Sequence, residues 1–189
     1  MDRVRNTDAF AAGNFLLFIG WNLFAFLSEG GTVGSLAEFG IYAASIFALI
    51  ALSWYFLRRR PCPTSLLLLV ELSLLAHFAG AFVPIDGARL YEAEILGLRF
   101  DKYVHLFNAY AGGALIDHFL QQDLKARPLI VAGLVLGVGA VVEIIEYLAF
   151  LAVSDAGVGG YENNMQDLVM NLVGVSLFLA FRIAVHRRG

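Results

Sequence analysis

The chain has 189 residues, of which 59% are hydrophobic and only 15% are charged, and its mean hydropathy is +0.73. A water-soluble globule of this composition would have too little polar surface to cover its core, so the composition favours a membrane protein with several spans. The net charge of −3 and the scattered basic residues provide no basic face, which excludes a nucleic-acid-binding protein. A single cysteine, Cys62, excludes an intrachain disulfide and says nothing about the redox compartment.

Six apolar stretches are long enough to cross a bilayer, which requires about 20 apolar residues per helix. Short segments rich in Gly, Pro or charge separate them, such as "SEGGTVGS" and "RRRPCP". The first stretch lacks a small-residue cleavage pattern, so we interpret it as a retained helix rather than a signal peptide. We predict an all-α bundle of six transmembrane helices in a single integral membrane domain, residues 1–189. The predicted helices span residues 9–28, 36–57, 64–84, 102–121, 128–153 and 167–186.

Lys and Arg are concentrated in four places that fall on one side of a six-helix topology. They precede the first helix, follow the second and the fourth, and close the chain. Because cytoplasmic loops carry the excess of Lys and Arg, both termini are predicted to be cytoplasmic. The longest outer loop, 85–101, contains "RLYEAEI", for which periodicity allows either a short strand or an interfacial helix.

Polar residues inside the predicted helices share a depth. A charged side chain within a span costs a few kcal/mol on insertion scales and usually faces the bundle interior. At about 1.5 Å per residue, six such residues from four helices fall within roughly 15 Å of the outer surface. Residues on the same helix are spaced three or four apart, so they share a face. These residues are His77, His105, Glu143, Glu146, Asp167 and Asn171, and Asp101 lies one turn before His105.

Three kinds of chemistry suit this set of residues. Imidazole and carboxylate ligands together suit a divalent metal such as Zn, Fe or Mn. Without a metal, the carboxylates can act as general acid and base. In the third interpretation they pair with basic residues around the longest outer loop and hold that loop in place. Those basic residues are Arg89, Arg99 and Lys102.

Each residue also has a simpler interpretation. Asp101 and Asp167 each stand at the start of a predicted helix, where an Asp caps free N–H groups. A single buried His is more often a hydrogen-bonded core residue than a ligand. Two carboxylates one turn apart, Glu143 and Glu146, repel each other inside a span and therefore favour a functional role.

Three polar residues lie outside the shared depth. Glu71 lies deeper in its helix, and we leave open whether it relays protons or pairs with another helix. Asp117 and His118 stand at the inner end of their helix and are predicted to form a solvated rim.

The motifs "DKYVH" (101–105), "VEIIEY" (142–147) and "DLVMNLVG" (167–174) resemble those of the VanZ-like membrane family. In that family's pattern, Glu146 stands where Gln is usual, and the Arg that is usual in the last outer loop is missing. The matching positions are Asp101, Lys102, His105, Glu143, Asp167, Asn171 and Gly174.

The longer layout, from His77–Gly80 to Asp167, is similar to the bacterial inner-membrane family typified by YjdF. The last outer loop, "GGYENNMQD", is poorer in Asp than that family's loop. The resemblances imply a multi-pass protein of the bacterial inner membrane with a role at the outer leaflet or cell envelope.

Our first hypothesis is therefore a membrane protein with an outward-facing, metal-binding site that binds or acts on a lipid-linked or envelope substrate. The alternatives are a non-catalytic accessory subunit of a membrane complex and a proton or ion pathway. The sequence leaves open whether the protein is an enzyme, and its expected partners are the bilayer and either a lipid-linked substrate or a membrane complex. Predicted metal ligands are His77, His105, Glu143, Glu146 and Asp167; predicted catalytic carboxylates are Asp101, Glu143 and Glu146; Asp101 and Asn171 are predicted supporting residues.

Overall fold

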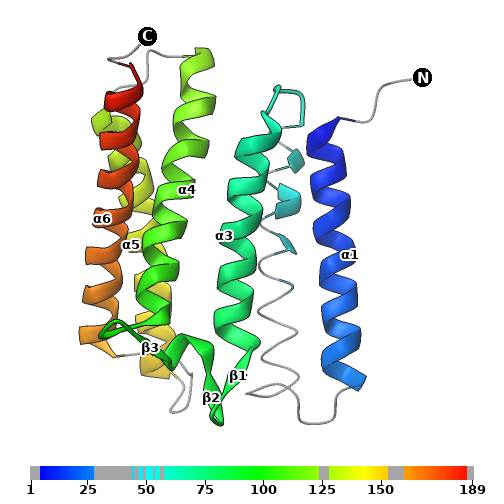
Figure 1. The fold of residues 1–189 in the computed structure, drawn as a ribbon, viewed down its shortest axis with the longest axis vertical. Helices are drawn as coiled ribbons and strands as arrows, with labels where there is room; N and C mark the ends of the chain where they lie inside the picture. The colour runs from blue at the N-terminus through cyan, green and yellow to red at the C-terminus, as the bar shows by residue number, and fades with distance from the viewer. Residues whose placement is uncertain are drawn as a thin grey trace.

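The computed structural model describes residues 5–27, 58–123, 128–152 and 160–186, together with several positions between 44 and 55. Within this part of the chain the structure is mostly helical, and the helices run side by side along one axis (Figure 1). The predicted helix at 36–57 lies largely outside the described residues. The helices are α1 (Asn6–Leu27), α3 (Thr64–Phe82), α4 (Phe100–Asp123), α5 (Pro128–Ala152) and α6 (Tyr161–His186).

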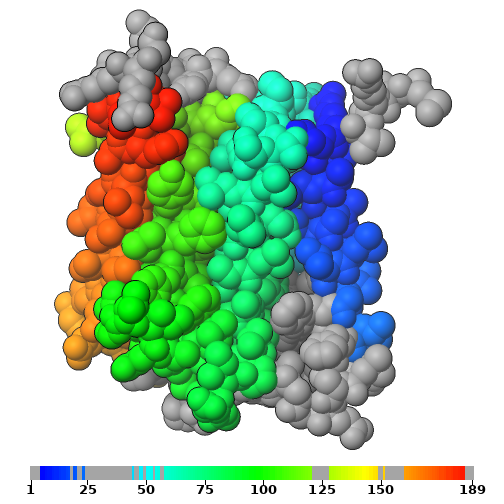
Figure 2. All heavy atoms as spheres, in the orientation of Figure 1, coloured from blue at the N-terminus to red at the C-terminus, as the bar shows by residue number. Residues whose placement is uncertain are grey.

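Three of the described helices are long and apolar enough to cross a membrane. They are Thr64–Phe82, Pro128–Leu148 and Tyr161–Val185. α4 is of similar length but contains more polar residues, and the space-filling view shows it packed between its neighbours (Figure 2). The helical class of the protein is thus confirmed, while the count of six spans and the orientation of the termini stay predictions.

A glycine sets the distance between α4 and α6. A Cβ atom built on Gly174 would overlap the backbone oxygen of Leu106, so no larger residue fits without moving a helix. Beyond this contact, Gly113 lies against the ring of Phe178. The core between α4, α5 and α6 is apolar and comprises Ala109, Val131, Val135, Val175 and Phe178.

Several other glycines in the helices make no such close helix contact in the part of the chain that the structure describes. A Cβ atom built on Gly112, Gly133 or Gly137 would have no described atom within 4 Å. Gly80 faces the ring of Tyr91 in the loop rather than a neighbouring helix. Among the described residues, close helix contact through glycine therefore depends on the crossing of α4 and α6 and on the contact of α5 with α6 at Gly139.

The segment between α3 and α4 forms two β-hairpins separated by one turn of 3₁₀ helix, η1 (Leu90–Glu92). The sequence pattern allows a strand or a helix here, and the structure contains both. β1 (Pro84–Ile85) pairs with β2 (Ala88–Arg89), and β3 (Glu94–Ile95) pairs with β4 (Leu98–Arg99), both antiparallel. Two-residue turns with positive φ at both positions close the hairpins, as in type I′ turns.

Three helices begin earlier than predicted. α6 begins at Tyr161 rather than at residue 167, α1 at Asn6 rather than 9, and α4 at Phe100 rather than 102. The extra α6 residues are polar, so the apolar pattern did not include them, but Asn164 donates a hydrogen bond to the backbone oxygen of Glu143 (2.8 Å). Asp167 therefore lies inside the helix, and its predicted role as an N-terminal cap is wrong.

The bundle has two chemically different ends. α1 begins and α6 ends at one end, which we call the termini end, and the two hairpins lie at the opposite, hairpin end (Figure 1). At the termini end Arg5 donates to the backbone oxygen of Arg58 (2.6 Å), and Arg182 pairs with Asp117 (2.8 Å). Asp117 is buried, so the predicted solvated rim is wrong at this residue.

Candidate functional site

A buried lysine joins the first turn of α4 to α6. The side chain of Lys102 is 2% exposed, and its Nζ lies 2.7 Å from Asp167 Oδ1 and 3.0 Å from Asp101 Oδ2. Removing an ammonium and carboxylates from water is unfavourable unless they are paired with good geometry. The two aspartates supply that pairing from two different helices.

Asn163 completes the surroundings of this lysine. Its Oδ1 accepts hydrogen bonds from Lys102 Nζ (2.8 Å) and from Arg99 Nη1 (3.2 Å), and its Nδ2 donates to Asp167 Oδ2 (2.8 Å). Asn163 and Asp167 are one turn apart on α6, so the early start of this helix places both side chains on the same face. The amide thus fixes the orientation of the Asp167 carboxylate.

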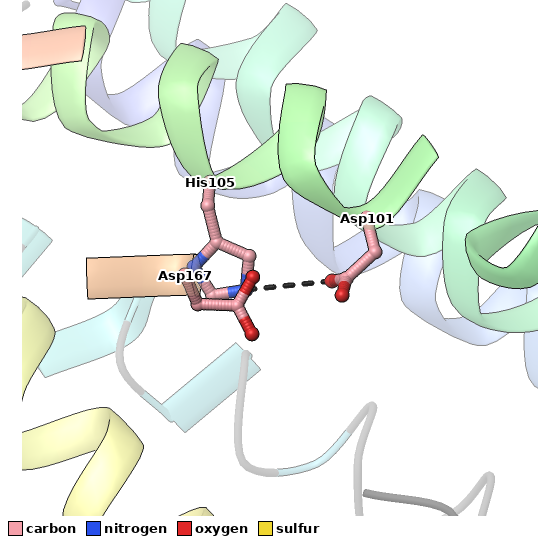
Figure 3. Close-up of side chains that lie close together, drawn as sticks. All are labelled: Asp101, His105 and Asp167. Atoms are coloured by element: carbon pink, nitrogen blue, oxygen red, sulfur yellow. Dashed lines mark ion pairs between the residues drawn. The ribbon is translucent and has the colours of Figure 1, made fainter. Parts of the chain in front are cut away.

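His105 lies between carboxylates from three helices. Its Nε2 is 3.4 Å from Asp101 Oδ1 and 3.6 Å from Asp167 Oδ1, and in Figure 3 the imidazole faces Asp101 while Asp167 overlaps it in the view. Its Nδ1 is 3.4 Å from Glu143 Oε1 on α5. Both ring nitrogens therefore face acidic oxygens.

Glu143 is the least satisfied member of the group. Its side chain is 3% exposed, and neither carboxylate oxygen has a hydrogen-bond partner in the described part of the chain. Buried polar atoms in native proteins are nearly always hydrogen-bonded, so each exception indicates a missing proton, water or ion. The carboxylate of Glu143 can therefore accept a proton, a water molecule or a cation.

Glu146 and His77 lie close to this group but outside its direct contacts. Glu146 is half-buried one turn after Glu143, near enough to interact electrostatically with His105 and Asp167. His77 interacts in the same way with His105, and its Nδ1 is hydrogen-bonded to the hydroxyl of Tyr91.

Tyr91 connects the hairpin segment to α3. A Cβ built on Gly80 would overlap Cε1 of Tyr91, so the glycine makes room for the ring that reaches His77. This contact gives His77 a structural partner in the loop between the hairpins.

The predicted supporting residue Asn171 lies further along α6. It is buried, and its Nδ2 would be 2.8 Å from a Cβ built on Gly139 of α5. The glycine therefore lets the Asn171 amide approach α5 closely. This position suits a role in packing α5 against α6.

Two residues contribute more to the site than the sequence pattern predicts. Lys102 is predicted only to tie down the loop, yet its ammonium is at the centre of the ion pairs. Asn163 falls in a predicted loop. Its spacing of four residues from Asp167 is the sequence signal that it belongs to the site, but this spacing places both side chains on one face only when the helix includes Asn163.

The arrangement has the donor set for a divalent cation. Asp101, His105 and Asp167 each offer one ligand atom, and these atoms lie within 4.8 Å of one another. Glu143 adds a carboxylate without hydrogen bonds beside His105. Imidazole nitrogen and carboxylate oxygen together suit Zn²⁺, Fe²⁺ or Mn²⁺, so the residues present fit such an ion.

Apolar helices long enough to span a bilayer, with buried ionisable residues gathered between them, define the class of helical integral membrane proteins. A family model described as "Predicted membrane protein (DUF2238)" matches residues 11–188, so the chain belongs to this family. No curated protein matches the chain, and no solved structure does.

Proposed function

We propose that the protein binds a divalent metal ion between α4, α5 and α6 at the hairpin end, in the group of Asp101, His105, Glu143, Glu146 and Asp167. The observation that carries this proposal is the Glu143 carboxylate, which is buried beside His105 without a hydrogen bond. A cation at this position would supply the missing partner.

The charges of the site support the same conclusion. Among the described residues, four carboxylates face Lys102 and His105, and Arg99 bonds to the edge of the group through Asn163. Carboxylates thus outnumber cations even when His105 carries a proton. Such an excess inside a protein is neutralised by protons or by a metal ion, because an isolated buried carboxylate is strongly disfavoured.

The surrounding protein suggests where the site acts. We infer six spans with both termini in the cytoplasm of a bacterium, since the described arginines near the membrane ends of α1, α3 and α6 lie at the termini end. The hairpin end and its site then face the outer leaflet of the inner membrane. A lipid-linked or envelope substrate is the class we propose, and the VanZ-like and YjdF-like motifs support it.

Metal content tests the proposal. The protein is purified in mild detergent through a tag that does not bind metal, and its metals are measured by mass spectrometry. We expect a stoichiometric ion in the wild type and its loss in His105→Ala and Glu143→Gln. His118→Ala is the matched control, because His118 lies on the same helix at the termini end and contacts the Pro61 oxygen (2.9 Å). A wild-type protein that retains no ion after equilibration with Zn²⁺, Fe²⁺ or Mn²⁺ would contradict the proposal.

A second candidate is a structural, non-catalytic subunit of a membrane complex. Lys102 favours it, because its ammonium already contacts Asp101, Asp167 and Asn163 and so ties α4 to α6 without a metal. In this case the protein lacks a bound ion, and a fixed partner co-purifies in mild detergent.

A proton or ion pathway is the remaining alternative. Glu71 would have to link the site to the cytoplasm, but its carboxylate accepts a hydrogen bond from Asn14 of α1 (2.8 Å). This hydrogen bond supports the second role considered for Glu71, pairing with another helix. Proton flux in liposomes that disappears in Glu71→Gln would restore the pathway hypothesis.

A further inference from the structure

The two hairpins share a backbone conformation but differ in the residue that begins the turn. Asp86 and Gly87 have φ values of 51° and 82°, and Leu96 and Gly97 have nearly the same values, 53° and 80°. Asp tolerates positive φ because its short polar side chain bonds locally, whereas a branched apolar residue is disfavoured there. The second hairpin therefore accepts a conformational cost to place a leucine at its tip.

This leucine is the most exposed large apolar side chain of the described structure. Leu96 is 94% exposed, and its neighbours Ile95 and Leu98 are 42% and 43% exposed. In the first hairpin the tip is polar, and Ile85 beside it is 39% exposed. The apolar surface thus extends over the whole tip of the second hairpin.

The position of the second hairpin explains this difference. The hydroxyl of Tyr103, in the first turn of α4, donates to the backbone oxygen of Ile95 (2.7 Å), so the hairpin folds back beside that helix. Figure 1 shows the β1–β2 hairpin projecting beyond the end of the bundle, while the β3–β4 hairpin bends sideways beside the helices. In Figure 2 the bright green segment that follows the β1–β2 hairpin covers the side of the bundle next to α6.

We propose that the tip of the β3–β4 hairpin, residues 95–98, inserts into the lipid layer around the helices, with Leu96 in contact with acyl chains. The helices beside the hairpin also expose apolar side chains, such as Val169 and Leu172 of α6, as expected of surfaces that face lipid. An apolar side chain gains free energy when it leaves water for hydrocarbon, which offsets the unfavourable turn conformation. The β1–β2 tip, with Asp86, stays in water.

Spin labels at the two tips test this proposal. Leu96→Cys and Asp86→Cys are made in a Cys62→Ser background and labelled with a nitroxide. The native Cys62 is buried, and burial raises the pKa of its thiol, so it reacts slowly with the label. The Cys62→Ser substitution removes the remaining background labelling. In phosphatidylcholine nanodiscs, collision rates with oxygen and with a water-soluble nickel chelate are then compared.

We expect oxygen collisions to dominate at position 96 and nickel collisions to dominate at position 86. Equal nickel access at both tips would overturn the proposal. Shielding of position 96 from both reagents would also overturn it, because that result indicates a protein partner at the tip.

A stability measurement provides an independent check that needs no label. Asn is favoured at positive φ, so Leu96→Asn relieves the turn. If the tip lies in lipid, the substitution lowers the melting temperature in nanodiscs, because a polar amide replaces an embedded leucine. A higher melting temperature, the result expected when the substitution only relieves the turn, would show that the tip is in water and would overturn the proposal.

Discussion

The helices α4 and α6 are joined by an ion pair at each end, and the two pairs differ. At the termini end Asp117 meets Arg182 at 2.8 Å, and the arginine side chain is 25% exposed. At the hairpin end Lys102 meets Asp167 at 2.7 Å, and both side chains are at most 2% exposed. The first pair lies near His118, whereas the second lies among additional carboxylates and His105.

This difference separates a structural tie from a candidate site. A partly exposed pair loses less solvation than a fully buried one, so its charges need less compensation from the protein. A fully buried group with excess acid must bind protons or a cation, because water cannot solvate it. The hairpin end is distinguished by its extra carboxylates, because Asp101 contacts Lys102 and Glu143 contacts His105 beside the Lys102–Asp167 pair.

Lys102→Met is predicted to have the largest effect on stability. It leaves the carboxylates of Asp101 and Asp167 buried without their ammonium, and breaking a buried pair in this way costs about 3–5 kcal/mol. The unfolding free energy is measured in mild detergent. Arg182→Met is the matched control and is expected to cost less, because the Asp117–Arg182 pair is more exposed than the Lys102–Asp167 pair. Equal losses of unfolding free energy in the two variants would show that the two ion pairs contribute alike to stability.

Gly174→Ala is predicted to have the next largest effect. The added Cβ overlaps the Leu106 oxygen, so α4 and α6 must separate, and such overpacking costs about 1–3 kcal/mol. Gly112→Ala is the control, since no described atom lies within 4 Å of its Cβ position, and we expect it to be neutral or stabilising. Thermal unfolding of both variants checks this prediction, which fails if Gly112→Ala is the more harmful.

Asp117→Asn is predicted to have a smaller effect and to leave metal binding unchanged. The amide keeps one acceptor for Arg182, so the loss of charge costs about 1 kcal/mol. The matched variant is Asp167→Asn, which should lose the bound ion as well as stability. Metal analysis of the two purified variants shows which end of the bundle binds the ion. Loss of the ion in Asp117→Asn would contradict a metal site at the hairpin end.

Glu71→Gln is predicted to have the smallest effect. The glutamine oxygen still accepts the hydrogen bond from Asn14, so the unfolding free energy should change by about 0.5 kcal/mol or less. The content of bound metal should equal that of the wild type. A large loss of stability would show that the charge of Glu71 has a further partner in the native protein.

Periodicity and composition predicted much of the described fold. The apolar stretches 64–84 and 128–153 correspond closely to α3 and α5, because burial in lipid needs long runs of apolar residues that are visible in the sequence. The hairpins between α3 and α4 were not resolved from the sequence, because four strands of two residues each are too short to show a period. The extension of α6 was missed because polar residues lie on its first turns.

The sequence by itself determined that the chain is a helical membrane protein and that acidic residues and histidines share a depth near one end. Only the tertiary structure decided which of them meet. The 2.7 Å contact between Lys102 and Asp167 depends on the register of α4 against α6, which Gly174 sets through its contact with Leu106. Helical spacing places side chains on a face, but packing between helices determines what that face contacts.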